Sequence, residues 1–270
     1  MTIRRSLILA TAVLAGALMA PATAQTDTST HDGAFVPEVG QSGKDVIWVP
    51  TPQALVDRML DMASLTADDT LVDLGSGDGR TVITAAKRGA RARGIEYNPD
   101  MVALSRSAAL REGVADRATF EQADIFESDF SDATVVTLFL LPGLNMRLRP
   151  TLLDMAPGTR VVSNSFTMGD WEPDETSKAE NCQNYCIAYM WVVPAKVEGT
   201  WKTPAGELTL TQTFQMVQGT LQKGGQTVPL EGRLNGAQLT LKAGNDEYVA
   251  QVSGSKMQGT LNGEPWSAAL

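Results

Sequence analysis

The amino-acid sequence predicts a doubly wound, mostly parallel α/β domain followed by a small all-β domain. Residues 71–80 form an apolar run that ends in a glycine-rich stretch and leads into a helix-like segment, the order expected at the start of such a sheet. Four more apolar runs alternate with helical segments up to residue 164. From about Lys196 onward, short β-rich runs separated by glycines replace this pattern. We therefore place the two domains at residues 44–194 and 195–270.

The glycine-rich stretch is the element around which the first domain is organised. Asp73 closes the apolar run, and Gly75, Gly77 and Gly79 follow at alternate positions. Glycine suits this loop because the backbone must turn sharply, reach positive φ and approach a ligand with no Cβ in between. The dinucleotide fingerprint would need a glycine where this chain has Arg80. The loop therefore predicts a site for a nucleoside-containing cofactor, with a spacing unlike that fingerprint.

Capping residues and periodicity predict the other elements of this domain. Thr51 and Pro52 indicate the N-cap and first residue of an amphipathic helix, and Asn98 and Pro99 indicate the same for a helix that stops at Gly113. Residues 134–140 are apolar on both faces, as a buried parallel strand should be. The expected strands are 71–74, 92–96, 118–123, 134–140 and 159–164, and the expected helices follow Pro52, Gly79, Asn98 and Leu141.

Two carboxylates lie where a cofactor would need them. Glu96 ends the second strand, roughly 20 residues past the glycine loop, at the distance expected of an acid that binds ribose hydroxyls. Asp124 follows the third strand. The carboxyl ends of parallel strands meet at one edge of a sheet, so we expect both acids beside the loop. Trp48 and Thr51 could cover this site, or Trp48 could belong to the core.

The pattern D-x-G-x-G-x-G at residues 73–79 resembles motif I of the class I S-adenosylmethionine (SAM) methyltransferases, which have a Rossmann-like fold. The resemblance implies that the loop holds the amino-acid end of SAM, Glu96 takes the ribose hydroxyls, Asp124 bonds the adenine amine and Ile125 packs on the adenine ring. The cofactor-binding residues that we predict are Asp73, Gly75, Ser76, Gly77, Asp78, Gly79, Glu96, Tyr97, Asn98, Asp124, Ile125 and Leu140.

A closer resemblance covers roughly residues 45–194. The segments 48–51, 73–80, 96–99, 124–126, 139–142 and 166–173 are similar to the mitochondrial lysine methyltransferases that modify ATP synthase subunit c and adenine nucleotide translocase. This resemblance implies methylation of a lysine amine on a protein. Small-molecule methylation and a non-catalytic binding module that retains the fold stay open as alternatives. Side chains near strand ends give the substrate-side candidates Pro142, Asn145, Asn164 and Trp171.

Composition narrows the chemistry. The single histidine, His31, precedes the folded part, so Ser-His-Asp triads, Cys-His dyads and histidine bases are excluded there, and a zinc site is not expected. Without Arg4 and Arg5 the chain has 20 Lys and Arg against 31 Asp and Glu, a net charge of −11, which disfavours nucleic acid as a partner. Cys182 and Cys186 can form one local disulfide or stay as two half-buried thiols.

Residues 1–24 have the pattern of a signal peptide. Arg4 and Arg5 precede an apolar run from Leu7 to Ala20 and an A-x-A cleavage site that ends at Ala24. Residues 25–43 are polar and are expected to form a flexible leader. We expect export, to the periplasm of a bacterium, with an envelope or membrane-associated protein as a possible substrate; the alternative is anchorage by an uncleaved N-terminal segment.

The C-terminal region contains a short repeated pattern. Residues 198–200, 218–220 and 258–260 each place Gly-Thr after Glu or Gln, between β-rich runs such as 208–216 and 248–252. Strands this short and regular suggest an antiparallel barrel or sandwich whose glycines lie in turns. We interpret it as a docking or stabilising module; a ligand inside a barrel is the alternative.

Overall fold

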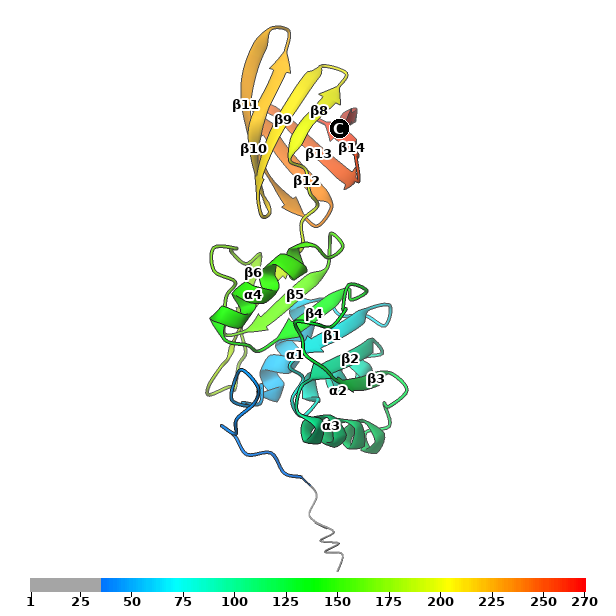
Figure 1. Ribbon diagram of the computed structural model, residues 1–270. Helices are drawn as coiled ribbons and strands as arrows, with labels where there is room; N and C mark the ends of the chain where they lie inside the picture. Colours follow the sequence, from blue (N-terminus) through cyan, green and yellow to red (C-terminus); the bar gives the residue numbers. More distant parts are fainter. Residues whose placement is uncertain (1–34) are drawn as a thin grey trace, which may run out of the picture. The chain divides into compact units, whose positions relative to one another are not determined.

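The computed structural model describes residues 35–270, so the predicted signal peptide (1–24) and the first part of the predicted leader lie outside the described residues. The predicted α/β sheet is confirmed (Figure 1). It has seven strands in the order β3-β2-β1-β4-β5-β7-β6. Five are parallel: β1 (Thr70–Leu74), β2 (Arg91–Glu96), β3 (Ala118–Gln122), β4 (Val135–Leu138) and β5 (Arg160–Asn164).

Two strands of this sheet were not predicted from the sequence. β7 (Ile187–Val192) pairs antiparallel with β5, and β6 (Glu175–Lys178) pairs antiparallel with β7. They extend the parallel core beyond β5, and β7 ends at Val192. The apolar run of β7 was a usable signal, whereas β6 is short and its sequence is polar.

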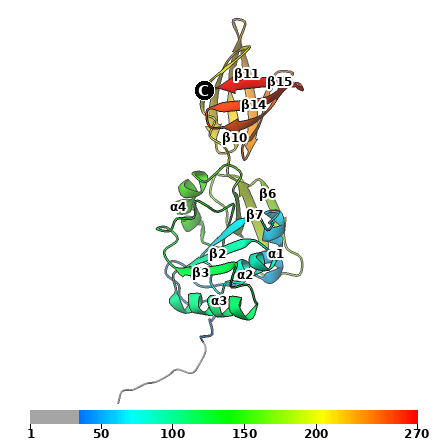
Figure 2. The same ribbon diagram turned by 90° about the vertical axis from the view of Figure 1, so that its right-hand side faces the viewer.

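The two faces of the sheet are covered by different helices (Figure 2). One cluster joins Leu71, Val135 and Val162 with the helices α1 (Gln53–Met62), α2 (Arg80–Lys87) and α3 (Pro99–Arg111). Strand positions on the opposite face pack with α4 (Pro142–Leu153). Helices cover both faces of the sheet, and its strands are apolar along nearly their whole length. Polar side chains therefore gather at the carboxyl ends of the strands, which the helices leave open.

Helix caps agree with the prediction in one case and differ in another. The Asn98 side chain accepts hydrogen bonds from the backbone N–H of Asp100 and Met101 and caps α3, as predicted. At α1 the N-cap position is Pro52, one residue later than predicted, and it makes no side-chain cap. Thr51 instead uses its hydroxyl to accept a hydrogen bond from Asn164. This contact fixes the entry of α1 against the end of β5.

The predicted flexible leader needs a correction at its C-terminal end. Residues 40–48, which we call the N-terminal hairpin, form a turn closed by the bridge between Ser42 and Ile47. The backbone N–H of Gly40 donates to Trp48 O and that of Trp48 donates to Gln41 O, both at 2.9 Å. Polar composition predicted a flexible leader up to residue 43, but these backbone hydrogen bonds order residues 40–43 together with the rest of the hairpin.

The C-terminal domain is a closed antiparallel barrel of eight strands. Of the two predicted architectures, the barrel is therefore confirmed and the sandwich is not. Apolar side chains of the inward-facing positions, including Trp201, Tyr248 and Trp266, share one core. The strands are β8 (Gly199–Thr203), β9 (Gly206–Thr213), β10 (Met216–Lys223), β11 (Gln226–Asn235), β12 (Gln238–Ala243), β13 (Asp246–Ser253), β14 (Lys256–Leu261) and β15 (Glu264–Ala269).

The repeated glycines of this domain were expected in turns, but all three belong to strands: Gly199 is the first residue of β8, and the other two lie inside strands. Gly219 belongs to β10 and Gly259 to β14. A Cβ on either residue would lie 2.0 Å from a carbonyl oxygen of the neighbouring strand, Thr209 O or Val249 O. Glycine therefore permits the close approach by which the strands curve into a barrel.

Cys182 and Cys186 form a disulfide in the loop that joins β6 to β7, which resolves the alternative left open by the sequence. The N–H of Ala179 donates to Cys186 O at 2.8 Å and so joins the two ends of the loop. The N–H of Ser165, which follows β5, donates to Ile187 O at 2.7 Å and ties the start of β7 to the end of β5. Within residues 35–270, no helix is both long and apolar enough to span a membrane.

Candidate active site

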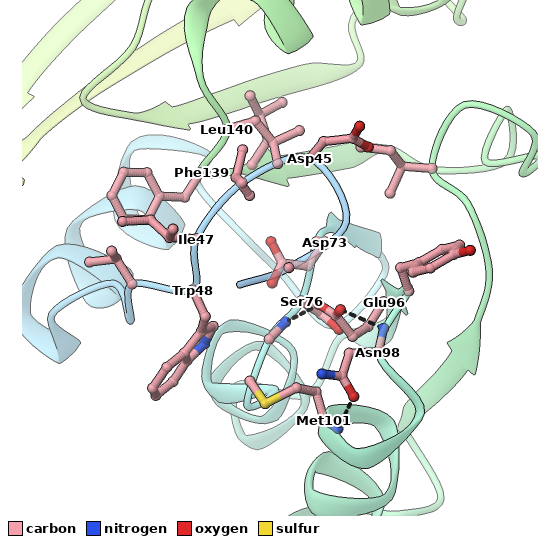
Figure 3. Close-up of a pocket in the computed structure, with 18 of the residues that line it drawn as sticks. Asp45, Ile47, Trp48, Asp73, Ser76, Glu96, Asn98, Met101, Phe139 and Leu140 are labelled. Carbon is pink, nitrogen blue, oxygen red and sulfur yellow. Dashed lines mark hydrogen bonds between the residues drawn. The ribbon is translucent and has the colours of Figure 1, made fainter. Parts of the chain in front are cut away.

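A pocket opens at the carboxyl ends of β1, β2 and β4 (Figure 3). Its walls are the N-terminal hairpin, the glycine loop, the ends of β2 and β4, and residues that follow β3 and β5. Eleven of the twelve predicted cofactor-binding residues line it: Asp73, Gly75, Ser76, Gly77, Asp78, Glu96, Tyr97, Asn98, Asp124, Ile125 and Leu140. The topology therefore gathers residues from four strand ends, those of β1, β2, β3 and β4, into one site.

Gly79 is the predicted residue that does not line the pocket. It has φ +79° and is the N-cap of α2, and a Cβ there would lie 2.7 Å from the Phe120 ring and 2.8 Å from Ser105 Cβ. Its place is under the loop, where it allows α2 to start close to β3 and α3. Gly79 thus contributes to the site by shaping the loop.

Glu96 connects the glycine loop to the end of β2. One carboxylate oxygen accepts the N–H of Gly77 and the other that of Asn98, both at 2.9 Å (Figure 3). Gly77 has φ +54°, and a Cβ there would lie 2.7 Å from Nε1 of Trp48, so the loop and the indole are closely packed. Each carboxylate oxygen keeps lone pairs for further donors, such as hydroxyl groups of a ligand.

Asp73 is a buried carboxyl in the pocket wall. Burial raises its pKa to about 7, the hydrogen bond from Thr137 Oγ1 (2.7 Å) opposes the rise, and the carboxylates of Asp78 and Glu96 add to it. A cation bound beside Asp73 would lower this pKa and be attracted by the carboxylate. The pocket therefore has an anionic position suited to a positively charged ligand group.

Asp124 and the N-terminal hairpin meet across the pocket. Lys44 of the hairpin forms an ion pair with Asp124, and its ammonium lies 4.9 Å from the centroid of the Tyr97 ring. The hydrogen bond and charge of Lys44 lower the pKa of Asp124. Asp124 also accepts the N–H of Phe126 at 3.0 Å. A ligand amine that bonds to Asp124 would share this carboxylate with Lys44.

The four substrate-side candidates do not line the pocket. Asn145 and Asn164 are buried one layer behind it: Asn145 Nδ2 donates to Phe166 O at 3.3 Å, and Asn164 Nδ2 donates to Thr51 Oγ1 at 3.2 Å. Both accepting residues line the pocket. Pro142 starts α4 and is exposed, whereas Trp171 is buried against Trp191 and Phe214.

Sequence reasoning missed the aromatic half of the pocket. Phe139, Phe166 and Tyr185 line it, from the segments that follow β4 and β5 and from the disulfide loop. We call these three residues the aromatic cluster. Phe139 and Phe166 belong to segments that carry the family resemblance, so they could have been named, whereas no local signal pointed to Tyr185.

The residues present fit a nucleoside cofactor with a cationic amino-acid end. Ser76 lines the pocket, while its buried hydroxyl has no hydrogen-bond partner among the described residues and faces Gly94 of β2, where a Cβ would lie 2.5 Å from Oγ. Glu96 and Asp124 offer acceptors, Asp73 offers a carboxyl next to the loop, and the carboxylate of Asp78 is paired with Arg80. Together with the sheet topology, this donor set defines a class I SAM-dependent methyltransferase.

Comparisons with known proteins identify the family. The model of the ANTKMT methyltransferase domain matches residues 73–175. A protein-lysine N-methyltransferase of Saccharolobus islandicus (strain REY15A) is 42% identical over 151 residues, which cover 55% of this chain and 94% of that protein. The adenine nucleotide translocase lysine N-methyltransferase of Mus musculus is 39% identical over 105 residues, covering 38% of this chain and 46% of that protein.

A solved structure of a methyltransferase is similar to about the same share of the chain. It is named an RNA methyltransferase from Salinibacter ruber in complex with S-adenosyl-L-homocysteine and is 50% identical, with a TM-score of 0.52, covering 55% of this chain and 96% of that one. The chain therefore belongs to the family of the ANTKMT methyltransferase domain and is a SAM-dependent methyltransferase. It spans about half the length of the mouse relative.

Proposed function

We propose that the protein methylates a lysine amine on a protein substrate. The observation that carries the proposal is the division of the pocket into two halves. Carboxylates and the glycine loop form the cofactor half, at the ends of β1, β2 and β3, and apolar and aromatic side chains form the half at the ends of β4 and β5. The relatives named as lysine methyltransferases support the same acceptor.

In this proposal the glycine loop, Glu96 and Asp124 hold the cofactor, and the apolar half receives the acceptor. The cofactor supplies an electrophilic methyl group: the amine lone pair forms the N–C bond as the S–C bond breaks, the bonding electrons stay on sulfur as a neutral thioether, and the surplus proton goes to water. Leu140, Leu141 and Phe139 exclude water from the acceptor and orient it.

The acceptor must lose a proton before it can react. A lysine amine has an ordinary pKa near 10.4, and desolvation lowers it because a low-dielectric wall disfavours the charged form. Phe139, Leu140, Leu141 and Phe166 carry no charged group that would hold the ammonium in its protonated state. A histidine base is unnecessary for this route, in agreement with the lack of histidine in residues 35–270.

We expect acid-stable methyl-lysine as the product, formed faster as the pH rises. Incubation with SAM labelled on its methyl group and an envelope extract should put label into protein as methyl-lysine. At saturating SAM the initial rate should rise between pH 7 and 9, by at most about tenfold per unit, because the neutral fraction of the amine rises by that factor below its pKa.

Three outcomes would contradict this assignment. Label confined to small molecules would favour the small-molecule alternative, and label lost in mild base would indicate an ester. No label in any acceptor, from a protein that binds S-adenosylhomocysteine, would favour the non-catalytic binding module. The Glu96→Ala variant serves as the control for label that does not depend on the cofactor site.

RNA is disfavoured as the acceptor because the net charge of the chain is −9.

We also propose that the protein is exported and acts on an envelope protein. The leader pattern of residues 1–24 supports this, and so does the Cys182–Cys186 disulfide, because disulfides persist in oxidising compartments. Intact-mass measurement of protein from a cell-envelope fraction should give a chain that begins at Gln25. A full-length chain in that fraction would indicate the uncleaved anchor, and a full-length chain found in the cytosol alone would refute export.

A further inference from the structure

The aromatic cluster gathers three rings from segments far apart in the chain. The ring centroids of Phe139 and Tyr185 lie 5.1 Å apart, those of Phe139 and Phe166 6.1 Å apart, and those of Phe166 and Tyr185 6.5 Å apart. These are the separations of aromatic rings that pack against one another, so a cation would lie against the side of the cluster that lines the pocket and not between the rings. The cluster therefore gives the pocket an aromatic surface that can attract an organic cation.

Tyr185 is the unusual member of the cluster. The residue is 45% exposed although it lines the pocket, and its backbone has φ +54°, a left-handed conformation that a bulky residue rarely adopts. Such a conformation persists where the surrounding structure determines it. The adjacent residue, Cys186, is bonded to Cys182 and closes a loop of five residues around Tyr185.

We propose that the aromatic cluster binds the side-chain ammonium of the acceptor lysine, and that the Cys182–Cys186 disulfide holds Tyr185 in that site. This inference rests on the proposed function and names its acceptor subsite. A lysine side chain suits the cluster because its apolar stem can contact the rings while its charge faces them.

An aromatic site also suits the chemistry better than a carboxylate would. A carboxylate beside the ammonium would raise the pKa of the amine and oppose the loss of the proton. The cluster and the adjoining Leu140 and Leu141 contain no carboxylate, and the acidic residues of the pocket come from other segments: Asp45, Asp73, Asp78, Glu96 and Asp124. The rings also favour the charged amine, but by less than an adjacent carboxylate would, so the desolvated amine loses its proton more readily here than beside a carboxylate.

A pair of peptides tests the binding site without depending on turnover. One carries trimethyl-lysine at its centre, a fixed cation that cannot be methylated further, and the other carries a tert-butyl group in place of the trimethylammonium, which keeps the shape without the charge. Calorimetry on the full chain saturated with S-adenosylhomocysteine should show about 3- to 30-fold tighter binding of the cationic peptide.

Variants then assign this preference to Tyr185. Tyr185→Ala should weaken binding of the cationic peptide about 3- to 10-fold and leave the affinity for S-adenosylhomocysteine unchanged, whereas Tyr185→Phe should keep the preference for the cation because the ring remains. Ile187→Ala is the matched control, since Ile187 is exposed near the same loop and does not line the pocket. Its affinity for the cationic peptide should equal that of the wild type.

The disulfide is tested in the same assay. Cys182→Ser with Cys186→Ser should lose cationic-peptide binding to a similar extent as Tyr185→Ala, and the combination with Tyr185→Ala should lose no more, because both act through one ring. The wild type with its disulfide reduced, checked by mass, should match the serine variant. Unchanged cation binding in both disulfide-free forms would overturn the role of the bridge.

Failure of this inference is separate from failure of the proposed function. Equal affinity for the two peptides, no measurable binding of either at millimolar concentration, or a Tyr185→Ala variant that binds like the wild type would overturn the aromatic subsite, even if methyl-lysine forms. Absence of methyl-lysine with every lysine substrate would overturn the proposed function. An unchanged affinity for S-adenosylhomocysteine shows that a variant is folded.

Discussion

Replacing Glu96 by alanine is expected to weaken S-adenosylhomocysteine binding by about 1.5–3 kcal/mol, or roughly 10- to 150-fold. The carboxylate of Glu96 accepts the N–H groups of Gly77 and Asn98 and keeps lone pairs free for ribose hydroxyls. The substitution therefore removes a charged acceptor for the ligand and the link between the glycine loop and the end of β2.

Calorimetric titration of the purified chain measures this change. Glu127→Ala is the matched control because it removes the same charge from an exposed position after β3 that does not line the pocket. Its affinity should stay within about twofold of the wild type, since surface charges contribute little. Equal affinities of the wild type and Glu96→Ala, in proteins with equal melting temperatures, would refute the assignment of Glu96.

Much of the cofactor half could be predicted because its signals are local. The glycine loop needs positive φ at Gly75 and Gly77, and both residues show it. Glu96 and Asp124 follow apolar runs that the sequence displays, and parallel strands place their carboxyl ends together. Pattern and spacing therefore sufficed to bring most of these residues into one pocket.

The acceptor half depends on tertiary structure that sequence patterns do not encode. Tyr185 reaches the pocket because β7 returns antiparallel to β5 and the disulfide shapes the loop before it. Lys44 reaches Asp124 because residues 40–48 fold back as a hairpin, and no sequence pattern predicted that fold. Asn145 and Asn164 were predicted at the site because they lie near strand ends, but their amide groups hydrogen-bond to Phe166 and Thr51, which line the pocket.

The two aspartates at the ends of β1 are perturbed in opposite directions. Burial opposes the charged form of Asp69, but hydrogen bonds from Thr134 and Thr66 and the Arg160 guanidinium outweigh burial and lower its pKa. Burial dominates at Asp73 and raises its pKa from 3.8 to about 7. The charged form of Asp69 stabilises the fold, whereas the charged form of Asp73 destabilises it. A cationic ligand bound beside Asp73 would reduce that destabilisation.

We expect Asp73→Asn to stabilise the ligand-free protein at pH 8 by about 1–3 kcal/mol. The pKa of Asp73 is higher in the folded protein (about 7) than in the unfolded chain (3.8), so the folded state holds the proton more tightly. The free energy of unfolding is therefore highest below pH 3.8 and falls as the pH rises to about 7. The shift sets an upper limit of about 4 kcal/mol, and the asparagine amide, which lacks a partner for its N–H groups, reduces the gain.

Urea unfolding of the ligand-free chain at pH 5 and pH 8 measures this effect. The stability advantage of Asp73→Asn should appear at pH 8 and shrink at pH 5, where wild-type Asp73 is already mostly protonated. Asp69→Asn is the control of opposite sign, because it breaks the ion pair with Arg160 and should destabilise the protein at both pH values. A destabilised Asp73→Asn at pH 8 would contradict the raised pKa.

Binding of SAM should show the functional side of the same carboxyl. In the wild type, affinity for SAM should rise as the pH increases toward 7 and level off above it, with proton release on binding at pH 6, because a cation beside Asp73 favours the carboxylate. Asp73→Asn should lose this pH dependence and bind SAM more weakly at pH 8, while it unfolds at a higher urea concentration. A variant that gains stability and keeps full affinity for SAM would show that Asp73 does not face the cationic end of the cofactor.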